Sequence, residues 1–166
     1  MKTFLLLLLF VPLIMQGQDL SENITKSTLE FKRLFLVKDF EALTNSASPK
    51  LIEHLKTKQD LIFLLTELSK SAESKGVKVT NIEFGSHSEI ITFKDQLQCS
   101  IPFTLKLEDA RKEVIFSAGL ALISFDKGDT WTFTFKIEEN QLLNNKILDL
   151  DPKIHINARL QIINTK

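Results

Sequence analysis

The spacing of hydrophobic residues changes about halfway along the chain. In the first half, apolar residues recur every three or four positions, the period of an amphipathic helix. This pattern predicts helices over 20–43, over 49–56 and from Thr57 to Gly76, where a glycine is well placed to end a helix. Inside the first segment, Ser27-Thr28-Leu29-Glu30 fits the S-x-x-E capping box that often begins a helix.

Two polar residues are expected to start short helices within this half. The pair Lys38-Asp39 interrupts the first apolar stripe, and Asp39 is predicted to cap a short helix through Leu43. Ser48 precedes Pro49, and proline is favoured in the first turn of a helix, so Ser48 is predicted to cap the next one.

The second half of the chain follows the two-residue period of β-strands. It predicts strands over 77–84, 89–93 and 99–107. The apolar phase slips near Thr80-Asn81, which predicts a bulge. In the third strand, Pro102 lacks an N–H and therefore predicts an edge or bulged position.

A hairpin over Val114–Ile137 is the strongest pattern, and the rest of the chain is expected to cover it. Its first strand is apolar on both faces, which predicts a central position in the sheet. Its second strand alternates, so that one face is apolar and the other polar. The apolar face carries Trp131, Phe133, Phe135 and Ile137, and the polar face carries Thr130, Thr132, Thr134 and Lys136.

Helices followed by a run of antiparallel strands indicate an α+β domain, with N-terminal helices packed on one face of a strongly curved sheet. The tail from about residue 138 is polar with scattered aliphatic residues. It is predicted to form at most a terminal edge segment, from Ile154, Ile156, Leu160 and Ile162.

The first residues are typical of a secretory signal peptide. Lys2 is followed by an apolar run from Phe4 to Met15, too short to span a bilayer, and Gly17 offers a cleavage site. We therefore expect residues 1–17 to be removed and residues 18–166 to form one domain, exported to the periplasm or secreted. No membrane attachment is expected after cleavage.

Composition excludes several function classes. Lys plus Arg and Asp plus Glu are 21 each, so no basic excess favours nucleic acid. There are 13 Phe and no Tyr, so no phenol can act as an acid or an oxyanion donor. The single cysteine, Cys99, cannot form an internal disulfide and is interpreted as a small buried hydrophobic residue.

One motif resembles the Asp-box of sialidases and other β-propellers. Ser124-Phe125-Asp126-Lys127-Gly128-Asp129-Thr130-Trp131 fits S-x-D-x-G-x-T-W, but propellers repeat it and this chain has one copy. We interpret it as turn chemistry rather than a glycan site: Asp126 binds backbone amides of its own turn, and Gly128 takes a positive φ.

Candidates for acid–base chemistry are few. The histidines His54, His87 and His155 share no helical or strand spacing, so no metal site is predicted. Asp39, His54 and His87 are the weak catalytic candidates. No nucleotide, cofactor or hydrolase motif occurs, and no cofactor is expected.

The order of elements resembles the nuclear transport factor 2-like superfamily, in particular its small exported bacterial members. The resemblance rests on Phe35-Leu36-Val37-Lys38-Asp39-Phe40-Glu41-Ala42-Leu43, Ser48-Pro49-Lys50-Leu51-Ile52, Ala121-Leu122-Ile123-Ser124 and Gly128-Asp129-Thr130-Trp131-Thr132-Phe133. It implies a cystatin-like cone, formed by three helices and a bent sheet, whose interior serves as a pocket. Enzymes of this superfamily place Tyr, Asp or His on the inner strands.

The residues expected to face inward are all apolar, which disfavours catalysis. They are predicted to line a ligand site: Ile101, Phe103, Leu105, Trp131, Phe133 and Phe135. We therefore expect a non-catalytic domain that binds an apolar small molecule or a protein at the cone or its rim. Two alternatives stay open: a pocket enzyme of isomerase, dehydratase or hydrolase type, and a structural module that forms a homodimer through the polar sheet face.

Overall fold

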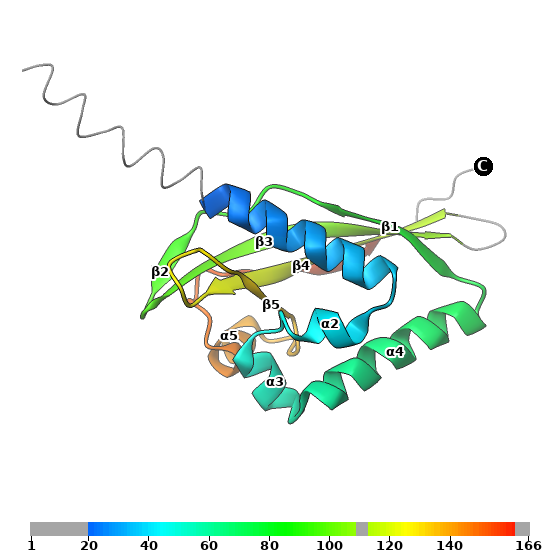
Figure 1. Ribbon diagram of the computed structural model, residues 1–166, viewed down its shortest axis with the longest axis horizontal. Helices are drawn as coiled ribbons and strands as arrows, with labels where there is room; N and C mark the ends of the chain where they lie inside the picture. Colours follow the sequence, from blue (N-terminus) through cyan, green and yellow to red (C-terminus); the bar gives the residue numbers. More distant parts are fainter. Residues whose placement is uncertain (1–19, 109–112, 162–166) are drawn as a thin grey trace, which may run out of the picture.

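The computed structural model describes residues 20–108 and 113–161 (Figure 1). The predicted signal peptide lies outside these residues. A helix over 20–36 is followed by α2 (Phe40–Thr44), α3 (Pro49–Leu55) and α4 (Lys58–Ser74). The strands and the last helix follow in the order β1 (Lys78–Phe84), β2 (Ile91–Phe93), β3 (Gln96–Glu108), β4 (Glu113–Ser124), β5 (Thr132–Phe135), α5 (Gln141–Leu148) and β6 (Ala158–Gln161).

Most predicted helix ends are confirmed by their capping groups. Asp39 Oδ1 accepts a hydrogen bond from the Ala42 N–H (3.0 Å), and Ser48 Oγ accepts one from the Leu51 N–H (3.2 Å). Thr57 Oγ1 accepts from the Asp60 N–H and caps α4 (3.1 Å). Gly76 follows the end of α4 with φ of +74°, a conformation that glycine adopts without strain.

The capping box predicted at Ser27–Glu30 is wrong. Residues 27–30 lie in the middle of the helix over 20–36, and Thr28 Oγ1 donates to the Thr25 carbonyl, one turn back. A capping box signals a helix start only where the preceding residues are not helical, and here residues 20–26 are already helical.

The six strands form one antiparallel sheet, which confirms the α+β class. β3 and β4 pair along their whole length at its centre. β1 and β2 pair with the outer side of β3, and β5 and β6 with the outer side of β4. The sheet does not close on itself, so the cone stays a prediction. The bulge near Thr80 is confirmed by a register shift between Val79 and Asn81.

Pro102 lies on a central strand, at a point where one neighbour is missing. β1 pairs with residues 103–108 of β3, and β2 pairs with residues 96–98. Pro102 therefore lies in the gap between these two paired stretches. Its carbonyl accepts a hydrogen bond from the Gly85 N–H just beyond the end of β1 (2.9 Å). The missing N–H is therefore tolerated because no strand pairs with β3 on that side of Pro102, while β4 pairs with it on the other side.

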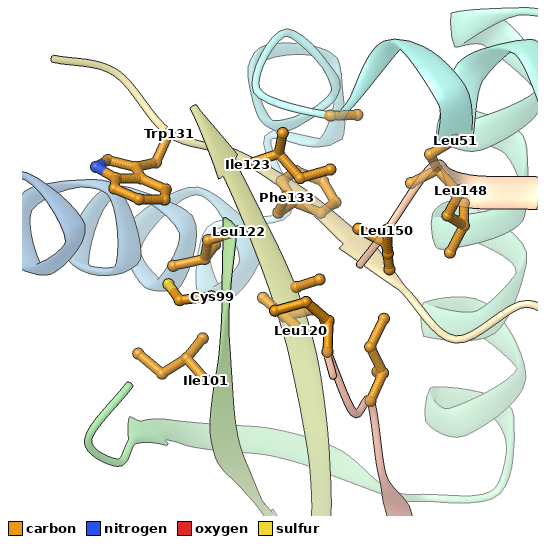
Figure 2. Close-up of a cluster of buried hydrophobic side chains, with 14 of the residues drawn as sticks. Leu51, Cys99, Ile101, Leu120, Leu122, Ile123, Trp131, Phe133, Leu148 and Leu150 are labelled. Carbon is orange, nitrogen blue, oxygen red and sulfur yellow. The ribbon is translucent and has the colours of Figure 1, made fainter. Parts of the chain in front are cut away.

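Both faces of the sheet are covered. The helix over 20–36 and α2 lie over the first face, where Cys99, Leu122, Trp131 and Phe133 are buried. On the opposite face, Ala121 and Ile123 of β4 are buried, and Gln98 of β3 binds the chain that follows α5. Figure 2 shows Leu51 of α3 beside Leu148 of α5 at the edge of this core.

The predicted exposure of the second face of β5 is wrong. Thr134 is 0% exposed, because the tail after residue 138 folds back over the sheet instead of forming only an edge segment. Leu148, Leu150, Ile154 and Ile156 of this tail are buried. The predicted edge segment is partly right, since β6 pairs with β4 over 158–161, while Ile162 lies outside the described residues. The alternative of a homodimer through this face of β5 required the face to be exposed, and the burial of Thr134 removes that support.

The free edge of β5 is capped by the loop between α2 and α3. The Ser48 N–H donates to the Phe133 carbonyl, and the Phe133 N–H donates to the Ser46 carbonyl (both 2.8 Å). These bonds use the exposed edge groups of the strand and hold Ser48, the N-cap of α3, against β5. Within the part of the chain that the structure describes, no helix is both long and apolar enough to cross a membrane.

Candidate functional site

The helix α4 runs over one face of the sheet, and hollows lie between the helix and the strands. It packs against α2 and α3, and α2 lies between it and the helix over 20–36 (Figure 1). Leu61, at its start, is the one described residue of α4 that is fully buried, and Leu68 is still 60% exposed. At the far end, Lys38 forms an ion pair with Glu73. The apolar side of α4 is thus anchored at both ends without closing onto the strands.

Two cavities occupy the space between α4 and the sheet. The inner cavity, of about 300 Å³, is bounded by β4 and β5, and the outer cavity, of about 410 Å³, by β1 and β3. Both are lined by Phe35, Leu65 and Leu68, so they lie side by side along α4, and we name the pair the α4 groove. Its combined size is in the range of small-molecule sites, roughly 300–1,000 Å³.

The inner cavity is almost entirely apolar. Its described lining contains one ionisable side chain, Lys136, and one amide, Asn157. The remaining lining residues come from the first helix, α2, α4 and the strands: Phe31, Phe35, Leu43, Leu64, Leu65, Leu68, Phe103, Phe116, Ala118, Gly119, Leu120, Phe133 and Phe135. Such a surface offers dispersion contacts and no acid or base near its centre.

Lys136 and Asn157 lie where two strands meet along β4. β5 pairs with β4 from Leu120 to Ile123, and β6 pairs with it from Ile115 to Ala118, which leaves Gly119 between them. Lys136 follows the end of β5, and the backbone of Asn157 passes Gly119 closely. Strand alternation had placed Lys136 away from the apolar face, but the strand ends at Phe135 and alternation no longer applies.

The ammonium of Lys136 has one exposed partner. Its Nζ donates to Glu139 Oε2 at 2.8 Å, and this hydrogen bond lowers the pKa of the Glu139 carboxyl. The Lys136 side chain is 25% exposed and that of Glu139 is 99% exposed. The lysine stem therefore lies along the cavity while the charge meets solvent.

The outer cavity ends in polar residues. Lys38 and Glu73 are already paired with each other there, and Ser69 and Lys78 complete its polar lining. Within the described residues, Lys78 forms no ion pair. The groove thus has a cation near each end and apolar walls between them.

The predicted ligand-binding residues are divided among several hollows. Phe103, Phe133 and Phe135 line the inner cavity together, and Leu105 lines the outer one. Trp131 is buried under the helix over 20–36, beside a hollow of about 320 Å³ that Phe133 also reaches. Ile101, a residue of β3, is buried and lines the cleft between that helix and the end of β1, the cleft that His87 also lines.

Reasoning from the strands alone missed half of the groove wall. Leu64, Leu65 and Leu68 belong to the apolar pattern that predicts the helix from Thr57 to Gly76, and no ligand contact was predicted for them. A regular apolar stripe does not tell whether the helix packs directly against the sheet or lines a hollow beside it. Phe31 and Phe35 belong to the same class, since a groove wall and a core face carry the same residue types.

His87 is the one catalytic candidate that reaches a cavity. It lines a cleft of about 560 Å³ between the helix over 20–36 and the end of β1. Its Nδ1 lies 2.7 Å from the Ser88 carbonyl oxygen, and its Nε2 lies 3.0 Å from Ser21 Oγ. A carbonyl only accepts, so in the neutral ring Nδ1 carries the hydrogen and Nε2 accepts from the Ser21 hydroxyl.

The other candidates have structural positions. Asp39 is the exposed N-cap of α2, and His54 is exposed in the last turn of α3. Cys99 is buried as predicted, and burial raises the pKa of its thiol to about 12, so it is not a nucleophile at neutral pH. Among the described residues, no cluster of three His, Cys, Asp or Glu side chains could hold a metal ion.

The Asp-box motif folds as the predicted turn. Asp126 Oδ1 accepts from Ser124 Oγ (2.8 Å) and from the Thr130 N–H (2.9 Å), and Oδ2 accepts from Thr130 Oγ1 (2.6 Å). These bonds lower the pKa of Asp126 to about 2. Gly128 has φ of +101°, as predicted. Every oxygen contact of Asp126 is used within its own turn, so the motif works as a turn.

A scan against protein-family models and a search of curated proteins found no match to this chain.

Proposed function

We propose that this protein binds an elongated apolar small molecule in the α4 groove. The observation that carries the proposal is the inner cavity of about 300 Å³, where apolar side chains of α4 and of the sheet face each other across a hollow. Exposed apolar surface of this kind is unfavourable in water, and a ligand that fills the groove would remove it. The aromatic walls, including Phe103, Phe116 and Phe135, favour a chain or ring system over a polar metabolite.

A small molecule is favoured over a protein segment by the form of the site. The groove consists of two adjacent hollows covered by α4, whereas protein interfaces are flatter and larger. The lining supports binding through apolar contacts, since Lys136 is the one ionisable group described in the inner cavity.

Titration with N-phenyl-1-naphthylamine, a neutral dye that fluoresces in apolar sites, tests this function. The wild-type protein should bind the dye with saturation. Ala118→Phe, which fills the inner cavity from β4, should weaken binding at least tenfold, about 1.4 kcal/mol, without lowering the unfolding temperature.

Two substitutions in α4 form a matched pair. Leu65 lines both cavities, whereas Phe63 lies on the outer side of the same helix and is 66% exposed. Leu65→Gln should weaken dye binding, and Phe63→Gln should leave it unchanged, since glutamine preserves helix propensity in both. Equal dye affinity in all variants, or no saturable binding by the wild type, would refute the proposed site.

A second candidate function rests on the contact between Ser21 and His87. We propose ester hydrolysis in their cleft. As Ser21 Oγ attacks the ester carbonyl carbon, His87 Nε2 takes the hydroxyl proton and then gives it to the departing alcohol. Water, deprotonated by the same nitrogen, releases the acid from the acylated serine.

Labelling by a fluorophosphonate probe and hydrolysis of p-nitrophenyl acetate test this second function. Both should be lost in Ser21→Ala and reduced at least a hundredfold in His87→Gln. His54→Gln removes an exposed imidazole and should change neither. Labelling that persists in Ser21→Ala would exclude the serine as nucleophile.

A further inference from the structure

The charges at the rim of the α4 groove are arranged for an anionic ligand. In the inner cavity, the described lining contains Lys136 and no carboxylate. In the outer cavity, Glu73 is neutralised by Lys38, and Lys78 adds a further positive charge. An apolar ligand with a negative headgroup therefore meets attraction at the rim, and the one carboxylate of the described lining, Glu73, is paired with Lys38.

Lys136 can exchange its present partner for a ligand. Glu139 is almost completely exposed, so this ion pair is screened by water and contributes little to stability. The lysine stem is largely buried along the cavity, which directs the ammonium to the mouth beside Asn157. A carboxylate at this mouth would gain a charge-assisted hydrogen bond, while Glu139 returns to solvent.

The two cavities of the groove also follow one another along α4, as a single extended chain would require. The inner and outer cavities are adjacent and share Phe35, Leu65 and Leu68, so a ligand anchored at Lys136 would extend past these side chains along α4 toward β1. We propose that the ligand is a single-chain anionic amphiphile of the fatty-acid type, with its carboxylate at Lys136 and its alkyl chain along α4. This inference rests on the function proposed for the groove and adds the ligand class and its orientation.

Competition titrations with N-phenyl-1-naphthylamine test the inference. Palmitate should displace the dye at about tenfold lower concentration than methyl palmitate, which has the same chain and no charge. Lys136→Gln should remove this difference by weakening palmitate alone, and Lys136→Arg should retain most of it. The difference should shrink as salt screens the ion pair.

Lys78→Gln is the matched control, because it removes a lysine from the other end of the same groove. Because the carboxylate is placed at Lys136, Lys78→Gln should remove only screened long-range attraction and weaken palmitate by less than about twofold, far less than Lys136→Gln. If Lys78→Gln weakens palmitate and Lys136→Gln does not, the orientation is reversed and the inference is wrong. Equal affinities for palmitate and its methyl ester would refute the charged headgroup.

These outcomes are distinct from failure of the groove itself. If the dye, palmitate and methyl palmitate all fail to bind the wild-type protein, the function proposed above fails and the inference with it. If the dye and the ester bind but palmitate gains nothing from its charge, the groove binds neutral ligands and only the inference fails.

Discussion

Asp126 contributes to stability through hydrogen bonds that only its ionised form can accept in full. Its carboxylate receives the Thr130 N–H and the hydroxyls of Ser124 and Thr130. Asn23 of the first helix then donates to the carbonyl of Gly128 in the same turn (3.0 Å). A single side chain therefore organises the β4–β5 turn and, through it, the seat of the N-terminal helix.

We expect Asp126→Ala to lower the free energy of unfolding by about 1–2 kcal/mol, the usual range for such hydrogen bonds at an exposed site. The folded pKa of about 2 lies below the ordinary value of 3.8, so the carboxylate stabilises the fold above about pH 4. This contribution should vanish as the pH falls from 4 toward 2.

Urea unfolding at pH 7 and at pH 2.5 measures both effects. Asp129→Ala is the control, because within the described residues the Asp129 side chain accepts no hydrogen bond from this turn. A difference between Asp126→Ala and wild type that is the same at both pH values would contradict the assigned cause.

At the scale of elements, α5 was the least predictable part of the fold. Its buried side includes Asn144 and Asn145, whereas Leu142 is 74% exposed, so its polarity is inverted at these positions. Asn144 Oδ1 accepts from the N–H groups of Ile137 and Glu138 (2.9 and 3.2 Å). These two residues belong to the segment that follows β5. A pattern of apolar residues cannot detect a helix that is fixed by buried amides.

We expect Asn144→Ala to lower the free energy of unfolding by about 1–3 kcal/mol, because it leaves two partly buried N–H groups without a partner. Leu142→Ala, two residues away on the same helix, should change it by less than about 0.5 kcal/mol. Thermal unfolding of the two variants checks this order. A larger loss in Leu142→Ala would contradict the placement of α5.

The elements that could be predicted are those whose signals are local. The caps at Asp39 and Ser48, the bulge near Thr80, the central position of β4 and the Asp126 turn all depend on a few neighbouring residues. The cover over Thr134 and the distance between α4 and the sheet depend on contacts between distant segments. For the same reason, the aromatic residues of the strands were foreseen as a lining, while Lys136 and the α4 wall were not.

At the scale of the whole molecule, the proposed binding of a ligand requires a hollow between the apolar surfaces of α4 and the sheet. The sheet is rigidly paired through β3 and β4, and α4 is anchored through Leu61 and through the Lys38–Glu73 pair at its ends. This arrangement lets the middle of α4 remain apart from the strands. Ligand contacts should therefore reach both walls at once.

Isotope-filtered NOE spectroscopy of the labelled protein with unlabelled palmitate measures this directly. We predict cross-peaks from the ligand methylene protons both to the methyl groups of Leu65 and Leu68 and to the rings of Phe103 and Phe135. Direct cross-peaks between Leu68 and Phe103, together with no ligand cross-peaks to either wall, would show a closed core and contradict the account.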